Sequence, residues 1–176
     1  MDQQTTQQIA DAKRAAEEGG VAGADSIDSM YLTFAVGSED YGLTIGMVTE
    51  IVGMQRIMVV PDVPDYIKGV INLRGKVIPL MDVRLRFNMA ERPYDDRTVV
   101  IVLEVNDAPM GLIVDRVREV IDIPDANIDS AHNFGGADSR SVVSGLGRIE
   151  ERVVILLDVP VLVSDMDVIA PQALRN

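Results

Sequence analysis

The residues that could do chemistry in this chain are few, and their types argue against catalysis. The chain has no cysteine and a single histidine, His132, which lies in a long polar loop. Catalytic dyads and histidine metal sites recruit several groups, so His132 is interpreted as an exposed loop residue. The sequence contains no phosphate-binding loop, dinucleotide fingerprint or nucleophile elbow. We therefore expect no enzymatic activity, no cofactor and no metal site.

The carboxylates are numerous, and two kinds of them recur in both halves of the chain. Asp82 and Asp158 each follow an apolar run, where a carboxylate can accept hydrogen bonds from the amides of the next turn. Glu50 and Glu119 recur on segments that alternate apolar and polar residues, with Val48 facing inward and Glu50 at the rim. Hydrolysis by paired carboxylates needs two such groups across a cleft, and no local spacing supports that arrangement.

Arg74 is the residue that most needs an explanation. The stretch VINLRGKVIPLMD, residues 70–82, places Arg74 and Gly75 between two apolar runs, as a hairpin tip requires. Two explanations stay open. A turn arginine improves solubility, whereas an arginine on a loop can also dominate the affinity of an interface.

Composition restricts the partners. With 16 basic and 28 acidic side chains, the net charge of −12 argues against binding to nucleic-acid phosphates or anionic membranes. The net charge does not exclude a local basic patch near Arg84 and Arg86. The N-terminus lacks the basic and apolar regions of a signal peptide, and the apolar run at 153–163 is too short to span a bilayer. We expect a cytoplasmic protein with no nucleic-acid partner and no direct membrane insertion.

The elements that position these residues are predicted to be short strands. Bursts of Val and Ile bounded by Gly, Pro, Asn and Asp predict a mostly β fold. Residues 1–29 are polar and predicted to be a mobile N-terminal tail, because a short isolated helix there would be marginal. Residues 30–165 are predicted to fold as the domain and 166–176 to form a C-terminal tail. Short helices are expected at 83–89 and at 159–166, the second weakened by Pro160.

An internal repeat organises the domain. Residues 42–51 align with 111–120 at an offset of 69, and residues 69–83 align with 145–159 at an offset of 76. The difference falls in a predicted loop around 133–138. Arg74 aligns with Glu150, so the fold does not itself require a cation at the tip. Chance similarity between Val-rich strands stays the alternative to duplication.

A duplicated fold would consist of two curled sheets of about five strands each. The halves, about 30–97 and 98–165, would be too small for independent cores and should pack together with a groove between them. Their boundary is approximate, and strands can exchange across it.

From about Tyr31 to Leu162 the sequence resembles the CheW family of bacterial chemotaxis coupling proteins. The string IKGVINLRG at 67–75 carries most of the resemblance, supported by the segments 48–51 and 111–120. The resemblance implies two SH3-like, five-stranded β-barrel subdomains on a shared core with short helices. It also implies a scaffold that works without catalysis or cofactor.

The resemblance implies two partners: the regulatory domain of the histidine kinase CheA and the cytoplasmic tip of a methyl-accepting chemoreceptor, in arrays at the inner membrane. A helical receptor tip would lay an apolar face into the groove between the barrels. The residues that match partner-binding positions are Arg74, Val48, Glu50, Ile45, Gly69, Val117 and Val120. The alternatives are a CheW-like adaptor of a non-flagellar sensory pathway, a small β-barrel hydrolase and an inert β scaffold.

Overall fold

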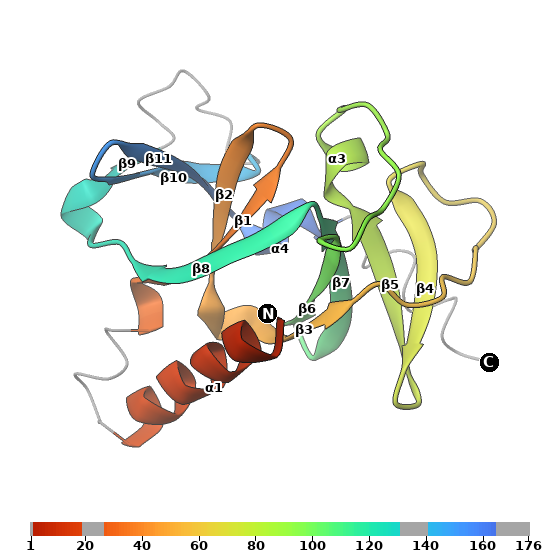
Figure 1. Ribbon diagram of the computed structural model, residues 1–176, viewed down its shortest axis with the longest axis horizontal. Coiled ribbons are helices and arrows are strands. Elements are labelled where there is room, and N and C mark those ends of the chain that lie inside the picture. The colour runs from red at the N-terminus through yellow and green to blue at the C-terminus, as the bar shows by residue number, and fades with distance from the viewer. Residues whose placement is uncertain (1, 19–26, 131–140, 165–176) are drawn as a thin grey trace.

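The computed structural model describes residues 2–18, 27–130 and 141–164, and its architecture is mostly β (Figure 1). Two curled sheets lie side by side, each an SH3-like barrel subdomain, which confirms the predicted fold class. His132, the loop at 133–138 and the predicted tail at 166–176 lie outside the described residues. The helices and strands are α1 (Asp2–Glu18), β1 (Met30–Val36), β2 (Glu39–Thr44), β3 (Val48–Gly53), β4 (Ile67–Leu73), β5 (Lys76–Asp82), α3 (Val83–Arg86), β6 (Val99–Val105), β7 (Ala108–Val114), β8 (Arg116–Asp122), β9 (Ile128–Ser130), β10 (Val143–Ile149), β11 (Arg152–Leu157) and α4 (Val159–Leu162).

The two sheets repeat one strand order. The first barrel has the order β3-β6-β7-β5-β4, and the second barrel has the order β8-β1-β2-β11-β10-β9. The sequence repeat aligns β3 with β8, β5 with β11 and β4 with β10, and each aligned pair holds the same place in the two orders. Each barrel also has a parallel junction at the same place, β5 with β7 and β11 with β2. The isolated bridge between Met58 and Val70 lies where β9 pairs with β10 in the second barrel.

Neither barrel is built from one half of the chain. Strands β1 and β2 complete the second barrel, whose remaining strands β8–β11 follow much later in the chain. Strands β6 and β7 in turn complete the first barrel beside β3, β4 and β5. Each sheet therefore contains described strands from both the earlier and the later part of the chain.

One apolar core joins the barrels. The largest cluster of buried side chains includes Leu32 and Phe34 of β1 together with Ile101 and Leu103 of β6. Because β1 and β6 belong to different barrels, burial of these residues stabilises both sheets and the contact between them.

The carboxylates Asp82 and Asp158 begin the short helices α3 and α4. Asp82 Oδ1 accepts a hydrogen bond from the Leu85 N–H at 3.3 Å, and Asp158 Oδ1 accepts one from the Val161 N–H at 3.1 Å. These bonds satisfy amides that have no partner in the first helical turn. Their predicted structural role is confirmed. Pro160 lies in that first turn, where a missing N–H costs nothing.

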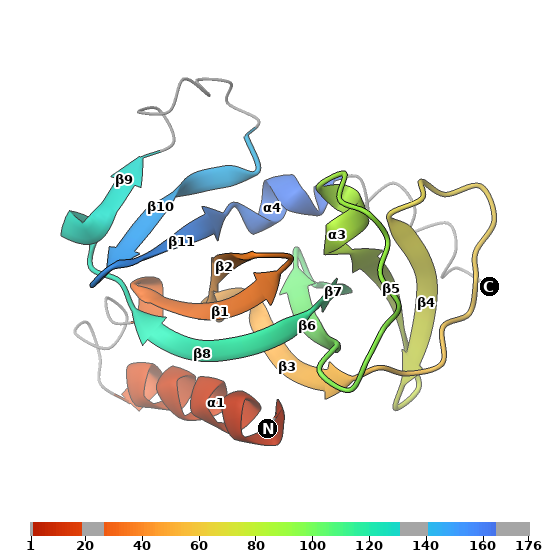
Figure 2. The same cartoon turned by 45° about the horizontal axis from the view of Figure 1, so that its top comes forward.

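Residues 2–18 correct the prediction of a mobile tail over 1–29. They form the 17-residue helix α1, which packs against β3 and β8 (Figure 2). Ile9 is 2% exposed and belongs to the main core cluster. The prediction was wrong because it judged the helix in isolation, whereas tertiary packing supplies most of the stability of protein helices.

Candidate partner-binding surface

Arg74 stands at the tip of the hairpin formed by β4 and β5. Leu73 pairs with Lys76, so Arg74 and Gly75 form a two-residue turn, with φ angles of 52° and 87°. Positive φ at both positions is what a type I′ turn requires. The Gly75 N–H donates to Asn72 Oδ1 at 2.9 Å, which fixes the turn. The Arg74 side chain is 68% exposed.

The guanidinium of Arg74 pairs with Glu50 of β3, with Nη2 and Oε2 2.5 Å apart. Strands β3 and β4 are the two edges of the first sheet, so this pair spans the edges where the barrel closes. The hydrogen bond from Arg74 to Glu50, with the negative charge of that carboxylate, raises the pKa of the arginine above its ordinary value. A hollow lined by Lys76, Val102 and Pro109 borders the pair, and a second hollow opens toward α1.

The second barrel contains a related ion pair that the sequence alignment did not predict. Glu119, the counterpart of Glu50, accepts a hydrogen bond from Arg152 Nη1 at 2.9 Å. Glu150, aligned with Arg74, has a φ of 55° at the tip of the hairpin formed by β10 and β11. In the first barrel the arginine of the pair lies in the turn, whereas in the second barrel Arg152 is the residue directly after the turn. Both barrels thus have an ion pair between a hairpin and the edge strand β3 or β8, but only the first barrel has its arginine at the hairpin tip.

Ile45 and Val48 lie in the core. Both side chains have 0% exposure, and both belong to the main buried cluster. In this conformation their side chains shape the surface from beneath and are not available to a partner.

Gly69 has a structural reason to be glycine. Its φ is 140°, and it lies at a bulge in the pairing of β4 with β5. A Cβ at this position would lie 2.1 Å from the carbonyl oxygen of Met58. Its counterpart Gly145 is crowded in the same way, with a Cβ placed 2.8 Å from the carbonyl oxygen of Asp129. The recurrence shows that close approach of the neighbouring chain fixes this residue type.

Val117 and Val120 lie on β8 and are half-buried against the main core cluster. They pair with Phe34 and Leu32 of β1 on either side of a bulge. Val117 borders a hollow whose charged lining includes Arg116, Arg118 and Arg152 together with acidic residues. The structure therefore brings Arg74 and Glu50 into direct contact, and it places Val117 and Val120 on the other strand that α1 covers.

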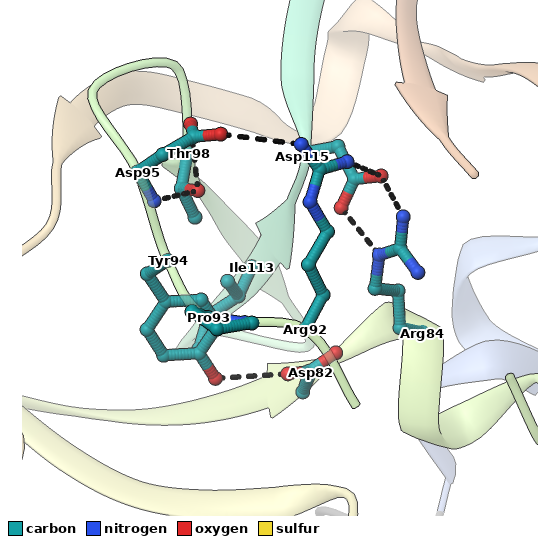
Figure 3. Close-up of a pocket in the computed structure, with 9 residues that line it drawn as sticks. All are labelled: Asp82, Arg84, Arg92, Pro93, Tyr94, Asp95, Thr98, Ile113 and Asp115. Carbon is teal, nitrogen blue, oxygen red and sulfur yellow. Dashed lines mark hydrogen bonds and ion pairs between the residues drawn. The ribbon is translucent and has the colours of Figure 1, made fainter. Parts of the chain in front are cut away.

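A polar network joins the barrels where β7 passes into β8 (Figure 3). Asp115 accepts hydrogen bonds from Arg84 Nε at 2.8 Å, from Arg84 Nη2 at 2.7 Å and from the Gly37 N–H at 2.8 Å. Arg84 belongs to α3 beside the first barrel, and Gly37 belongs to the turn between β1 and β2 of the second. Burial alone would raise the pKa of Asp115, but these hydrogen bonds and the arginine charges outweigh it and hold the pKa below its ordinary value.

The same network fixes the loop that follows α3. Tyr94 Oη donates to Asp82 Oδ2 at 2.8 Å, and burial together with this bond raises the pKa of the Tyr94 hydroxyl above its ordinary value. The enclosed space between these side chains is about 10 Å³, which is about the room that one water needs. The network is therefore a joint between barrels and has no room for a substrate.

Within the part of the chain that the structure describes, no three acidic or histidine side chains are placed to hold a metal ion. No helix among the described residues is long and apolar enough to cross a bilayer. The fold and the exposed pair together define a class of protein, a double-barrel binding module that presents a charged hairpin tip.

Comparison with known proteins identifies the family. The family model described as CheW-like domain matches residues 30–167. The chemotaxis protein CheW of Klebsiella aerogenes is 36% identical over 140 residues, which cover 80% of this chain and 84% of that protein. The chemotaxis protein CheW of Bacillus subtilis is 33% identical over 127 residues, which cover 72% and 81% respectively. The crystal structure of the scaffolding protein TtCheW from Thermoanaerobacter tengcongensis aligns with a TM-score of 0.68 at 33% identity, covering 74% of this chain and 88% of that chain.

The chain belongs to the CheW-like family. This result confirms the resemblance drawn from the sequence, and it assigns the chain to a family of scaffolds rather than enzymes. Helix α1 lies outside the residues that the family model matches.

Proposed function

We propose that this protein is a chemotaxis adaptor, which couples methyl-accepting chemoreceptors to the histidine kinase CheA by binding both without catalysis. The observation that carries the proposal is the ion pair of Arg74 and Glu50, exposed at the hairpin tip of a CheW-like double barrel. An arginine held in place by a carboxylate keeps most of its donors free for a partner.

The proposed receptor contact is a helix laid against β3 and β8. Glu50 lies on β3, and Val117 and Val120 lie on β8, where their half-buried side chains offer apolar surface beside charged groups. An amphipathic helix at the tip of a receptor hairpin fits such a surface through side chains spaced three and four residues apart. The buried side chains of Ile45 and Val48 support this surface from the core.

The proposed kinase contact is the end of the first barrel. Met58 and Val59, in the chain between β3 and β4, have 44% and 84% exposure, which is high for apolar side chains. The backbones of Met58 and Val70 of β4 exchange two hydrogen bonds, at 2.8 and 2.9 Å. These bonds hold Met58, and Val59 next to it, at the edge of the sheet. The regulatory domain of CheA is the proposed occupant. Binding of receptor and kinase then couples their signals only if both contacts favour the same state of the array.

Copurification of the full chain with a CheA regulatory domain and a receptor-tip fragment tests this function. The unmodified chain should retain both partners, and Arg74→Glu should weaken retention of at least one about tenfold. Arg148→Glu is the matched control, since Arg148 is also exposed and also paired, with Asp129 at 3.1 Å. A chain that retains neither partner would refute the proposal.

A further inference from the structure

Helix α1 covers the two strands that carry the proposed receptor contact. It packs against β3 and β8 and is seen along both in Figure 2. Lys13 Nζ donates a hydrogen bond to the Val48 carbonyl oxygen. The Ile51 N–H donates to Thr6 Oγ1 at 3.0 Å, and Thr6 Oγ1 donates in turn to the Ile51 carbonyl oxygen at 3.4 Å. The helix therefore makes polar contacts along β3.

One face of α1 makes all of these contacts. Thr6, Ile9 and Lys13 follow each other at spacings of three and four residues, which places them on a single helix face. Ile9 is buried in the main core cluster, whereas Ala10 is exposed on the neighbouring face. The contact thus has the form of an amphipathic helix docked on a sheet surface.

The N-terminal half of α1 also reaches the Arg74 pair. Gln3, Thr6 and Gln7 line the same hollow as Glu50 and Arg74. A partner helix that uses Glu50 and the apolar residues of β8 would need the space that α1 occupies. The covered strands β3 and β8 lie within the matched family residues 30–167, whereas α1 lies outside them.

We propose that α1 is an intramolecular occupant of the receptor-binding surface, and that a receptor helix binds only when α1 has left. This inference rests on the proposed function. Ile9 is the one large apolar side chain among the described contacts of α1, and docking must also order 17 residues. A contact of this size holds the helix weakly, so a partner with preference for the open state can shift the equilibrium.

Two variants of the full chain distinguish occlusion of the receptor-binding surface by α1 from the effect of an added negative charge on binding. Ile9→Asp places a carboxylate in the buried face of α1, and Ala10→Asp places the same group one residue away on the exposed face. The probe is a recombinant receptor-tip helical hairpin, titrated calorimetrically. We expect Ile9→Asp to bind the probe about three- to tenfold more tightly than the unmodified chain, because the closed state no longer competes. Ala10→Asp should bind as the unmodified chain does.

A second measurement follows α1 itself. Amide hydrogen exchange in residues 3–14 of the unmodified chain should speed up when the probe is saturating. Measurable but equal affinities for all three proteins, or weaker binding by Ile9→Asp, would overturn occlusion and leave the adaptor function standing. Protection of residues 3–14 that persists with the probe bound would also overturn it. A probe that binds none of the three would refute the proposed function and this inference with it.

Discussion

Arg74 and Glu50 form an ion pair between the two ends of the first sheet: the guanidinium at the tip of the hairpin of β4 and β5 lies 2.5 Å from the carboxylate on edge strand β3. The second barrel achieves a similar contact with Glu119 and Arg152, and its hairpin tip carries Glu150 instead of a cation. The ion pair itself therefore has a counterpart in the second barrel, whereas an arginine at the hairpin tip has none there. This difference lets its structural and binding roles be measured separately.

Reversal of the pair distinguishes the two roles of Arg74. The double variant Arg74→Glu with Glu50→Arg keeps opposite charges at the barrel closure but removes the arginine from the tip. We expect its melting temperature to stay within about 2 °C of the unmodified chain, since exposed ion pairs contribute little. Its binding to the receptor tip or to the kinase domain should still fall about tenfold. Full recovery of binding in the double variant would show that the pair, and not the tip arginine, is what the partner needs.

Gly69 is predicted to be required by the fold before it is required by a partner. Gly69→Ala would place a Cβ 2.1 Å from the Met58 carbonyl oxygen at a φ of 140°. We expect a loss of at least about 2 kcal/mol in the free energy of unfolding, measured by urea denaturation. The control is Gly53→Ala, because a Cβ at Gly53 meets nothing within 4 Å. Equal stability of the two variants would contradict the steric explanation.

The joint at Asp115 should make the fold sensitive to acid. Its pKa is lower in the folded protein than the ordinary 3.8, so the folded state binds the proton less readily than the unfolded state. The stabilisation is complete above that ordinary pKa and is lost as the pH falls through the depressed folded value. Asp115→Asn should destabilise the protein by about 2 kcal/mol at pH 7, since hydrogen bonds to charged groups contribute on that order.

The pH dependence of stability tests whether it is the ionised form of Asp115 that stabilises the joint. The stability difference between the unmodified chain and Asp115→Asn should shrink as the pH falls below the ordinary pKa of 3.8, which denaturant titration at each pH measures. Asp107→Asn, at an exposed turn with a φ of 63°, is the matched control for the loss of one carboxylate and should leave the free energy of unfolding at pH 7 within about 0.5 kcal/mol of the unmodified chain. A difference that stays constant with pH would mean that the ionised carboxylate is not what stabilises the joint.

Local patterns in the sequence predicted the strands, the hairpin at Arg74 and the capping carboxylates because these depend on near neighbours. The predicted alternation is absent from β3, because a bulge between Val48 and Glu50 breaks it: Val48 and Ile51 are both buried, and Glu50 between them is partly exposed. The network at Asp115 was not predicted, since Arg84 and Gly37 reach it only through the exchange of strands between barrels. The docking of α1 was missed because its single large apolar side chain, Ile9, becomes significant only beside β3 and β8.

Val48 and Val117 occupy equivalent places in the repeat but should respond differently to a charge. Val48→Asp would bury a carboxylate where exposure is 0%, so we expect a loss of about 4 kcal/mol or more in the free energy of unfolding. Val117 is half-buried, and Val117→Asp should stay folded at 25 °C while binding the receptor tip at least about fivefold more weakly. Val153→Asp, at an apolar residue of β11 with 51% exposure, controls for the added charge and should bind normally. Circular dichroism under denaturant and calorimetric titration measure the two effects. If Val117→Asp unfolds as Val48→Asp does, or binds as well as Val153→Asp, then Val117 serves the core and the receptor surface must lie elsewhere.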